Sequence, residues 1–388
     1  MPEIGLSTTA SPPVTGGLSR QRRREILAAY ATPSNRKGAL QVITTLAPIG
    51  LIWAGLAVFA PLPFAVLVLA TGVMALFLLR AFVLMHDCGH NTLMRSAVLN
   101  RVLGFCLGVI AGIPQYVWSK HHAYHHSTNG DWSKYRGPLA TITVDEYAAK
   151  SDAERRRYRR ARNPLIAPLA GFHYLIVNPR LTWLSGTLAL LRHLLSPRPG
   201  SPRLSLAGHA ARFETRHWAS WREYRHMTAN NLAVFATWAA MAWAVGPALF
   251  FGVYFGAIAL AGGAALVLFT VQHNFEGSYA SRTDHWDPDR AAIHGTSQLV
   301  LPRWLNWFTA DIALHDAHHL FASVPNYRLA ACHEACADLF VDVTRLRLGQ
   351  IPGALKCILW DVGSQRIVSV ASWAAASRDA EAAARAPV

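Results

Sequence analysis

Charged side chains are scarce in this sequence of 388 residues. Asp, Glu, Lys and Arg make up 15% of it and hydrophobic residues 52%, and the mean hydropathy is +0.20. A soluble chain of this length would form two or three domains, whereas this composition favours a membrane protein whose helices lie in lipid. Acidic residues are scarcest: the net charge is +15. In a membrane protein such an excess marks the cytoplasmic side, so we expect no nucleic-acid partner.

Cysteine is also scarce, with five residues and no CxxC pair. No disulfide framework is apparent, and we expect free thiols in a reducing compartment. Residues 1–19 lack the basic, apolar and small-residue order of a cleaved signal peptide. We therefore expect residues 1–37 to be a disordered, basic, cytoplasmic N-terminal region.

Long apolar runs are abundant, and each of four is about long enough to cross a membrane. The turns at 60–63 and near Gly246 carry no charge, while both flanks of the first pair carry arginines. This pattern predicts an all-α integral membrane protein with four transmembrane helices in two hairpins and both termini in the cytoplasm. Arg80 interrupts the second run, and we expect it to extend to the lipid headgroups. The predicted spans are 39–59, 62–85, 232–249 and 250–272.

Two further apolar stretches, 102–117 and about 164–191, could also be spans by hydropathy. If 102–117 crossed the membrane, His86 and His90 would lie on the opposite side from the histidines of 122–126. These residues could not then share one site. We therefore expect both stretches to be interfacial or re-entrant helices on the cytoplasmic side.

Eight of the 18 histidines fall in three short clusters, HDCGH, HAYHH and HDAHH. On a helix, residues separated by three or four positions share one face. Imidazoles that converge in this way are good metal ligands. A ninth histidine, His273, follows the fourth apolar run and is equivalent in position to the first cluster. The predicted ligands are His86, His90, His122, His125, His126, His273, His315, His318 and His319.

Nine imidazoles are too many for one ion and suit two. Ligand type alone fits Zn, Cu, Fe or Ni. A hydrolytic site needs only about three ligands and an open position, so this set favours redox chemistry on a lipidic substrate. His121 points about 100° away from His122 on a helix, and we leave it out of the site. Four carboxylates are expected to accept the second ring N–H of a ligand histidine: Asp87, Glu276, Asp311 and Asp316.

The three clusters resemble, in order and separation, the histidine boxes of the membrane fatty acid desaturase family. The similarity extends to WSKHHAYHHSTNGDW (118–132), VQHNFEGSYA (271–280) and residues 301–329, and it covers roughly residues 40–335. The spacing of the first box is similar to that of the acyl-lipid, omega-6 type. The resemblance implies a cytoplasmic helical cap that carries the boxes and two non-haem iron ions bound by these histidines. With O2 and two electrons, such a centre would insert a cis double bond into an acyl chain.

The resemblance leaves alternatives open. Carotenoid hydroxylases and ketolases and alkane hydroxylases share such boxes, so box spacing does not separate them from desaturases. A metal transporter would need ionisable ligands inside its spans, and the predicted spans 39–59 and 232–272 contain no histidine or carboxylate. No HPGG haem motif is present, so we expect a separate ferredoxin or cytochrome as electron donor. The arginine-rich segment 155–162 is expected to contact anionic lipids or an acidic donor. The predicted organisation is a desaturase domain over 38–335 and a cytoplasmic tail over 336–388, in a bacterial inner membrane.

Overall fold

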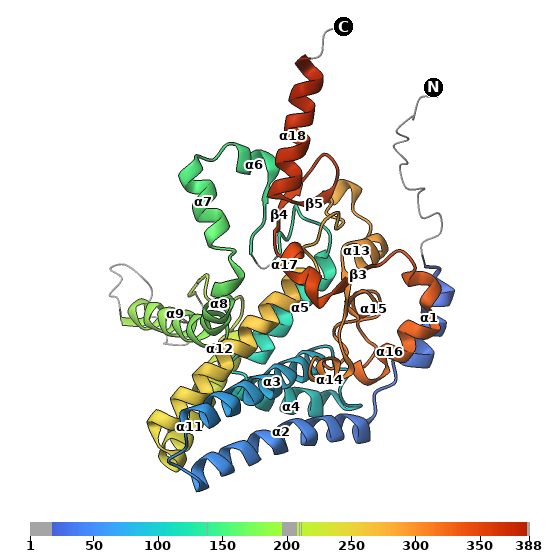
Figure 1. The fold of residues 1–388 in the computed structure, drawn as a ribbon. Helices are drawn as coiled ribbons and strands as arrows, with labels where there is room; N and C mark the ends of the chain where they lie inside the picture. The colour runs from blue at the N-terminus through green and yellow to red at the C-terminus, as the bar shows by residue number, and fades with distance from the viewer. Residues whose placement is uncertain (1–17, 138, 196–207, 209, 211, 386–388) are drawn as a thin grey trace.

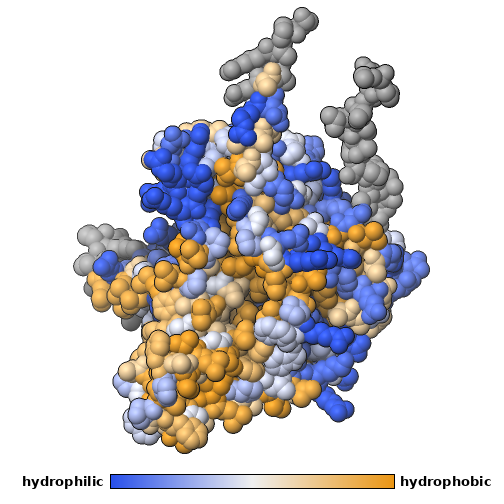
Figure 2. All heavy atoms as spheres, in the orientation of Figure 1, coloured by the Kyte–Doolittle hydropathy of each residue, from blue (hydrophilic) through white to orange (hydrophobic). Residues whose placement is uncertain are grey.

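The computed structural model describes residues 18–385 except 138, 196–207, 209 and 211. Within this part of the chain, three helices are long and apolar enough to cross a membrane: α2 (Asn35–Val58), α3 (Phe64–Gly89) and α12 (Pro247–Val271). A fourth crossing arises only if α4 (Ala97–Ile110) and α5 (Gln115–Thr128), which meet at 103°, form one broken span. Such a bend fits a broken span as well as a re-entrant loop, so the re-entrant character expected for 102–117 stays a prediction. Hydrophobic side chains cover the end of the molecule where α2, α11 and α12 lie (Figure 2).

The stretch 232–249, expected to be the third span, is not a separate helix. It lies largely in α11 (Trp221–Val245), whose polar first turns continue into the apolar part without a break. In the first turn Glu223 accepts a hydrogen bond from Lys120 of α5 at 2.6 Å. Gly246, with a φ of 87°, then reverses the chain into α12. The hairpin is therefore present, but α11 is not among the described helices apolar enough to cross a membrane.

Arg80 does not extend to the headgroups. It is 2% exposed and donates through Nε to the hydroxyl of Thr45 on α2 at 3.1 Å. Its guanidinium lies 3.8 Å from the centre of the Trp307 ring and also donates to the Trp307 carbonyl. A buried charge is costly unless it is paired and hydrogen-bonded, and these contacts meet that need inside the protein.

The stretch 164–191 forms a series of helices, of which α8 packs along α12 and α9 packs against α11. They are η1 (Pro164–Ile166), α8 (Ala167–Phe172), the π-helix η2 (His173–Val177) and α9 (Asn178–Leu195). At the crossing, Gly171 lies against the backbone of Gly262 and Gly263, and a Cβ on Gly171 would stand 2.2 Å from the carbonyl carbon of Gly262. Only glycine allows the two helices to approach so closely.

The remaining helices gather at the ends of α3 and α12 nearest the histidines (Figure 1). Residues 20–30 form a helix, although disorder was expected across 1–37. Its Ile26 is buried, and Arg22 pairs with Asp338 at 2.7 Å; the expected tail at 1–17 lies outside the described residues. The remaining α-helices in the described part of the chain are α1 (Arg20–Tyr30), α6 (Val144–Ala148), α7 (Asp152–Arg160), α13 (Pro288–His294), α14 (Arg303–Phe308), α15 (His315–Leu320), α16 (Asn326–Ala335), α17 (Ile351–Ala354) and α18 (Val370–Arg385).

Two small sheets interrupt the helical architecture and involve residues 336–388, which were expected to be a tail. β1 (Ile142–Thr143) pairs in parallel with β4 (Cys357–Asp361), which pairs antiparallel with β5 (Arg366–Ser369). β2 (Ser297–Val300) pairs in parallel with β3 (Thr344–Arg347). Because β2 precedes α15 and β3 follows it, this sheet joins the chain on both sides of the third histidine cluster.

Candidate metal centre

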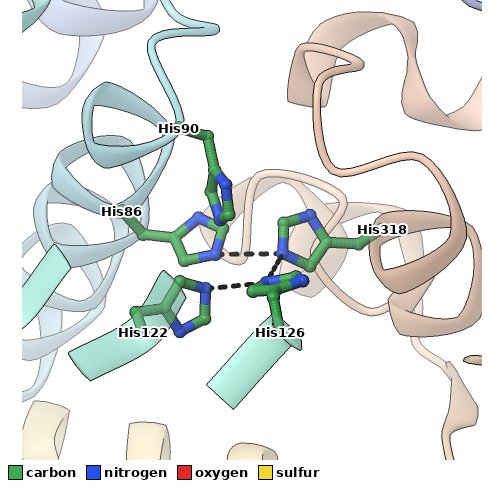
Figure 3. Close-up of side chains that lie close together, drawn as sticks. All are labelled: His86, His90, His122, His126 and His318. Atoms are coloured by element: carbon green, nitrogen blue, oxygen red, sulfur yellow. Dashed lines mark hydrogen bonds between the residues drawn. The ribbon is translucent and has the colours of Figure 1, made fainter. Parts of the chain in front are cut away.

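All nine predicted ligand histidines come together in two groups, and in each group one ring nitrogen from every member lies within 4.8 Å of the others. The first group, shown in Figure 3, is His86, His90, His122, His126 and His318; the second is His125, His273, His315 and His319. The structure thus unites residues from α3, α5, α15 and the end of α12. His121 is exposed and belongs to neither group.

The repeated HxxHH pattern explains how α5 and α15 serve both groups. On α5, His122 and His126 are one turn apart and enter the first group, while His125 enters the second. On α15 the one-turn pair enters the second group, and His318 enters the first. Each helix therefore lies between the two groups and gives two imidazoles to one and a single imidazole to the other.

The facing nitrogens are spaced as ligands of a common ion. A neutral imidazole nitrogen carries either an N–H or a lone pair, so a nitrogen with two nitrogen neighbours cannot satisfy both by hydrogen bonding. At a metal–nitrogen distance of about 2.0–2.1 Å, two ligands at a right angle lie about 2.9 Å apart. The donor set therefore fits a metal ion in each group. The Nε2–Nε2 distances are 3.1 Å for His86–His318, 3.0 Å for His318–His126, 2.9 Å for His126–His122, 2.9 Å for His273–His315, 3.1 Å for His315–His319 and 3.2 Å for His319–His125.

Burial favours the neutral form of several of these imidazoles. It lowers the pKa of His90, His318 and His319 well below the usual histidine range, and it lowers the pKa of His273 to about 4. Neutral imidazoles offer the lone pairs that metal binding requires. The ring of His273 is also oriented, because its Nδ1 faces the carbonyl oxygen of Gly295 at 3.3 Å. This contact leaves Nε2 free to bind a metal ion.

The two groups are adjacent and enclosed by aromatic rings. The rings of His126 and His319, one from each group, stack with centroids 4.2 Å apart. Trp118 stacks on His122 at 4.7 Å, and Phe269 lies 4.9 Å from His125. Two ions bound here would be neighbours in an apolar, water-poor setting.

One of the four predicted carboxylates contacts a ligand histidine. Asp87 Oδ1 lies 2.9 Å from Nδ1 of His86, and its other oxygen accepts the backbone N–H of Asn326 at 3.2 Å. A carboxylate in this place fixes the tautomer of the ring so that the lone pair of Nε2 is available to a metal ion. This contact also ties α3 to the start of α16.

The other three carboxylates have different partners. Asp311 accepts from the side-chain amide of Asn306, and Glu276 accepts the backbone N–H of Ser369 at 3.1 Å. Asp316 is fully buried and lies 3.1 Å from Nε2 of His333. Proximity in sequence suggested these carboxylates, but their side chains point to neighbouring loops and helices instead. No spacing pattern marked His333, since it is a lone histidine on α16.

Comparisons with known proteins agree with this geometry. A family model described as fatty acid desaturase matches residues 59–347, which include all nine histidines. The chain is 31% identical over 350 residues to a fatty acid desaturase of Bacillus subtilis (strain 168), covering 88% of each chain. It is 24% identical over 269 residues to an sn-1 oleoyl-lipid 12-desaturase of a Synechocystis species, covering 65% of this chain and 63% of the relative. A chloroplastic omega-6 fatty acid desaturase of Arabidopsis thaliana is 32% identical over 63 residues, 16% of this chain and 14% of the relative.

Proposed function

The chain belongs to the fatty acid desaturase family, whose members are oxidoreductases, and from that premise we propose that it inserts a cis double bond into a lipid acyl chain in an O2-dependent reaction. The observation that supports this most strongly is the convergence of nine histidines in two adjacent groups. A simple hydrolytic metal site would need fewer ligands. A paired, imidazole-rich centre suits redox chemistry at a carbon that carries no activating group.

We propose that each group holds one iron ion, the first through His86, His90, His122, His126 and His318 and the second through His125, His273, His315 and His319. Bound iron would supply the activation of O2 and the removal of hydrogen from an unactivated methylene. The protein's residues supply the conditions for this chemistry. Asp87 orients His86, burial favours the neutral form of several of the rings, and the aromatic rings around His122 and His125 exclude water.

The proposed substrate is an acyl chain held in a membrane lipid. The long apolar helices end beside the histidines, so a chain lying among them could reach the centre from the bilayer. The similarity to an sn-1 oleoyl-lipid 12-desaturase supports an acyl-lipid substrate over a soluble one. Regiochemistry would then depend on which carbon–carbon bond the protein holds against the centre.

We further propose that the histidine groups and both termini lie on the cytoplasmic side of a bacterial inner membrane. The basic residues of α1 and of the start of α2 support this orientation, because positive charge favours the cytoplasmic flank of a span. Electrons would come from a separate ferredoxin or cytochrome. Labelling of single cysteines placed near residues 90 and 125 tests the arrangement, since both sites should react from the same side.

Lipid analysis of cells that express the chain tests the proposed activity. New unsaturated acyl chains should appear in the wild type and be absent from a His125→Ala variant produced in equal amount. Oxygenated products in place of unsaturated ones would contradict desaturation and favour the hydroxylase or ketolase alternative.

A further inference from the structure

A groove of about 1120 Å³ lies outside the two histidine groups, beside the end of α7, the strand β4 and the start of α18. Its interior is apolar, with Phe275, Leu346, Ile358 and Val370 among the lining residues. The volume slightly exceeds the range of about 300–1,000 Å³ typical of ligand pockets. The groove is therefore large enough for a substantial part of an amphiphilic molecule.

Cationic side chains line one edge of this groove. Arg159, Arg162 and Lys356 contribute to the lining. Within the described chain, Arg159 and Lys356 are exposed and form no ion pair. Glu276 is the one carboxylate among the described lining residues, and it already accepts from Ser369. The edge therefore has an unbalanced positive charge suited to an anionic group.

The arginines continue beyond the groove along the same helix. A second hollow of about 340 Å³ is lined by three arginines and one carboxylate of α7, namely Arg155, Arg156, Arg159 and Asp152. In Figure 2 the hydrophilic surface over α7 borders hydrophobic surface on the side of α18 and on the side of α8. This sharp change from charged to apolar surface is typical of a membrane interface.

The position of α8 gives the depth of this boundary. Gly171 packs against Gly262, which lies about 13 Å before the end of α12 at 1.5 Å per residue. Between Arg162 and Gly171, the side chains of Leu165 and Leu169 are 86% and 72% exposed, as expected for residues that face lipid. If Leu165 and Leu169 face lipid, Arg162 lies where the chain leaves the apolar layer, and the groove opens at headgroup level.

We propose that this groove binds one anionic glycerophospholipid, with its phosphate at Arg159 and Lys356 and its apolar part along Leu355, Val370 and Ala374, which are partly exposed in the lining. The apolar, concave interior suits a lipid better than a protein surface, which would meet the exposed arginines but leave the interior unfilled. The proposed lipid is separate from the acyl substrate at the histidines. Its binding does not depend on metal or on the proposed reaction.

Native mass spectrometry of the purified full-length chain in detergent tests this site. With dioleoylphosphatidylglycerol and dioleoylphosphatidylcholine at equal concentration, we expect one phosphatidylglycerol to be retained per chain in clear preference. The double variant Arg159→Gln, Lys356→Gln should weaken that retention by about thirtyfold, because each of the two basic residues near an anionic lipid contributes on the order of 1 kcal/mol. The matched control is Arg157→Gln, Arg160→Gln, which removes the same charge from residues of α7 that do not line the groove, and it should retain the lipid.

A second variant tests the apolar part of the groove. Ala374→Trp places a large ring in the lining, and it should reduce retention of phosphatidylglycerol while the thermal unfolding midpoint stays within a few degrees of wild type. Equal retention of the two lipids by the wild type would overturn the proposal, as would an equal loss in the Arg157, Arg160 control. Wild-type retention by Ala374→Trp would also overturn it. If Arg159→Gln, Lys356→Gln kept its lipid but lost reduction by an acidic donor protein, the surface would be a protein-docking site instead.

Discussion

The Nε2 atoms of His86 and His318 lie 3.1 Å apart, although 232 residues separate them in the chain. His86 belongs to a long helix that is apolar enough to cross a membrane, and His318 to a short helix far along the chain. Their contact therefore requires the fold to bring α15 back to the end of α3. A shared metal ion gives a physical reason for two imidazole nitrogens to face each other at this distance.

His125 should be indispensable, because it belongs to the four-histidine group. We expect His125→Ala to abolish product and to lower the iron bound by the chain, while the amount inserted in the membrane is unchanged. Product by gas chromatography and iron by mass spectrometry are the measurements. His121→Ala is the matched control, since His121 is exposed and belongs to neither group, and it should remain active; a fully active His125→Ala would contradict the assignment.

Asp87→Asn should weaken the first group without removing a ligand. The amide can no longer hold His86 as a carboxylate does, and the loss of such a partner typically costs 10–100-fold in metal affinity or activity. Titration of the metal-free chain with Fe²⁺ measures the change. Asp284→Asn provides the control, because Asp284 also neighbours a histidine, His285, but in an exposed pair; the same loss in both variants would argue against an orienting role for Asp87.

Arg80→Leu should destabilise the protein. It removes the charged donor to the Thr45 hydroxyl and to the Trp307 carbonyl, and a hydrogen bond to a charged group contributes about 1.5–3 kcal/mol. We expect a lower thermal unfolding midpoint and less bound iron, because residue 307 lies on the segment that leads to α15. Arg101→Leu removes an exposed arginine from α4 and should leave both quantities unchanged. Wild-type behaviour of Arg80→Leu would show that the buried contacts are dispensable.

Gly171→Ala should loosen the packing of α8 on α12. The new methyl group would overlap the backbone of Gly262, and overpacking of this kind costs about 1–3 kcal/mol. The thermal unfolding midpoint in detergent should fall. The control is Gly252→Ala on α12, where the methyl group meets no neighbouring atom within 4 Å. That variant should be as stable as the wild type or slightly more stable. Equal midpoints for the two variants would contradict the close crossing.

The site was more predictable from sequence than the parts that surround it. The spacing of His122, His125 and His126 is a property of one helix, so their common face follows from helix geometry. Their division between two groups does not, because it depends on where α15 and the end of α12 lie. Partners such as His333 for Asp316 depend on the same tertiary arrangement and have no local signal.

The departures in the fold have similar causes. The position of Arg80 in an apolar run does not predict its contact with Trp307, because Trp307 lies 227 residues later in the chain. The strands β2 and β3 have four residues each and pair in parallel across the third histidine cluster, so no hairpin turn marks them in the sequence. The N-terminal helix α1 has a strongly basic sequence, and it is attached to the rest of the protein by burial of Ile26 and by the Arg22–Asp338 pair.

Iron bound by the purified, full-length chain is the most direct measure of the central claim. We predict two iron ions per wild-type chain after anaerobic loading and removal of excess metal. Loss of one group's ligands, as in a His315→Ala, His319→Ala variant, should leave about one ion. All five histidines of the other group remain in this variant. A wild-type chain that forms unsaturated lipid with no stoichiometric iron would contradict the account.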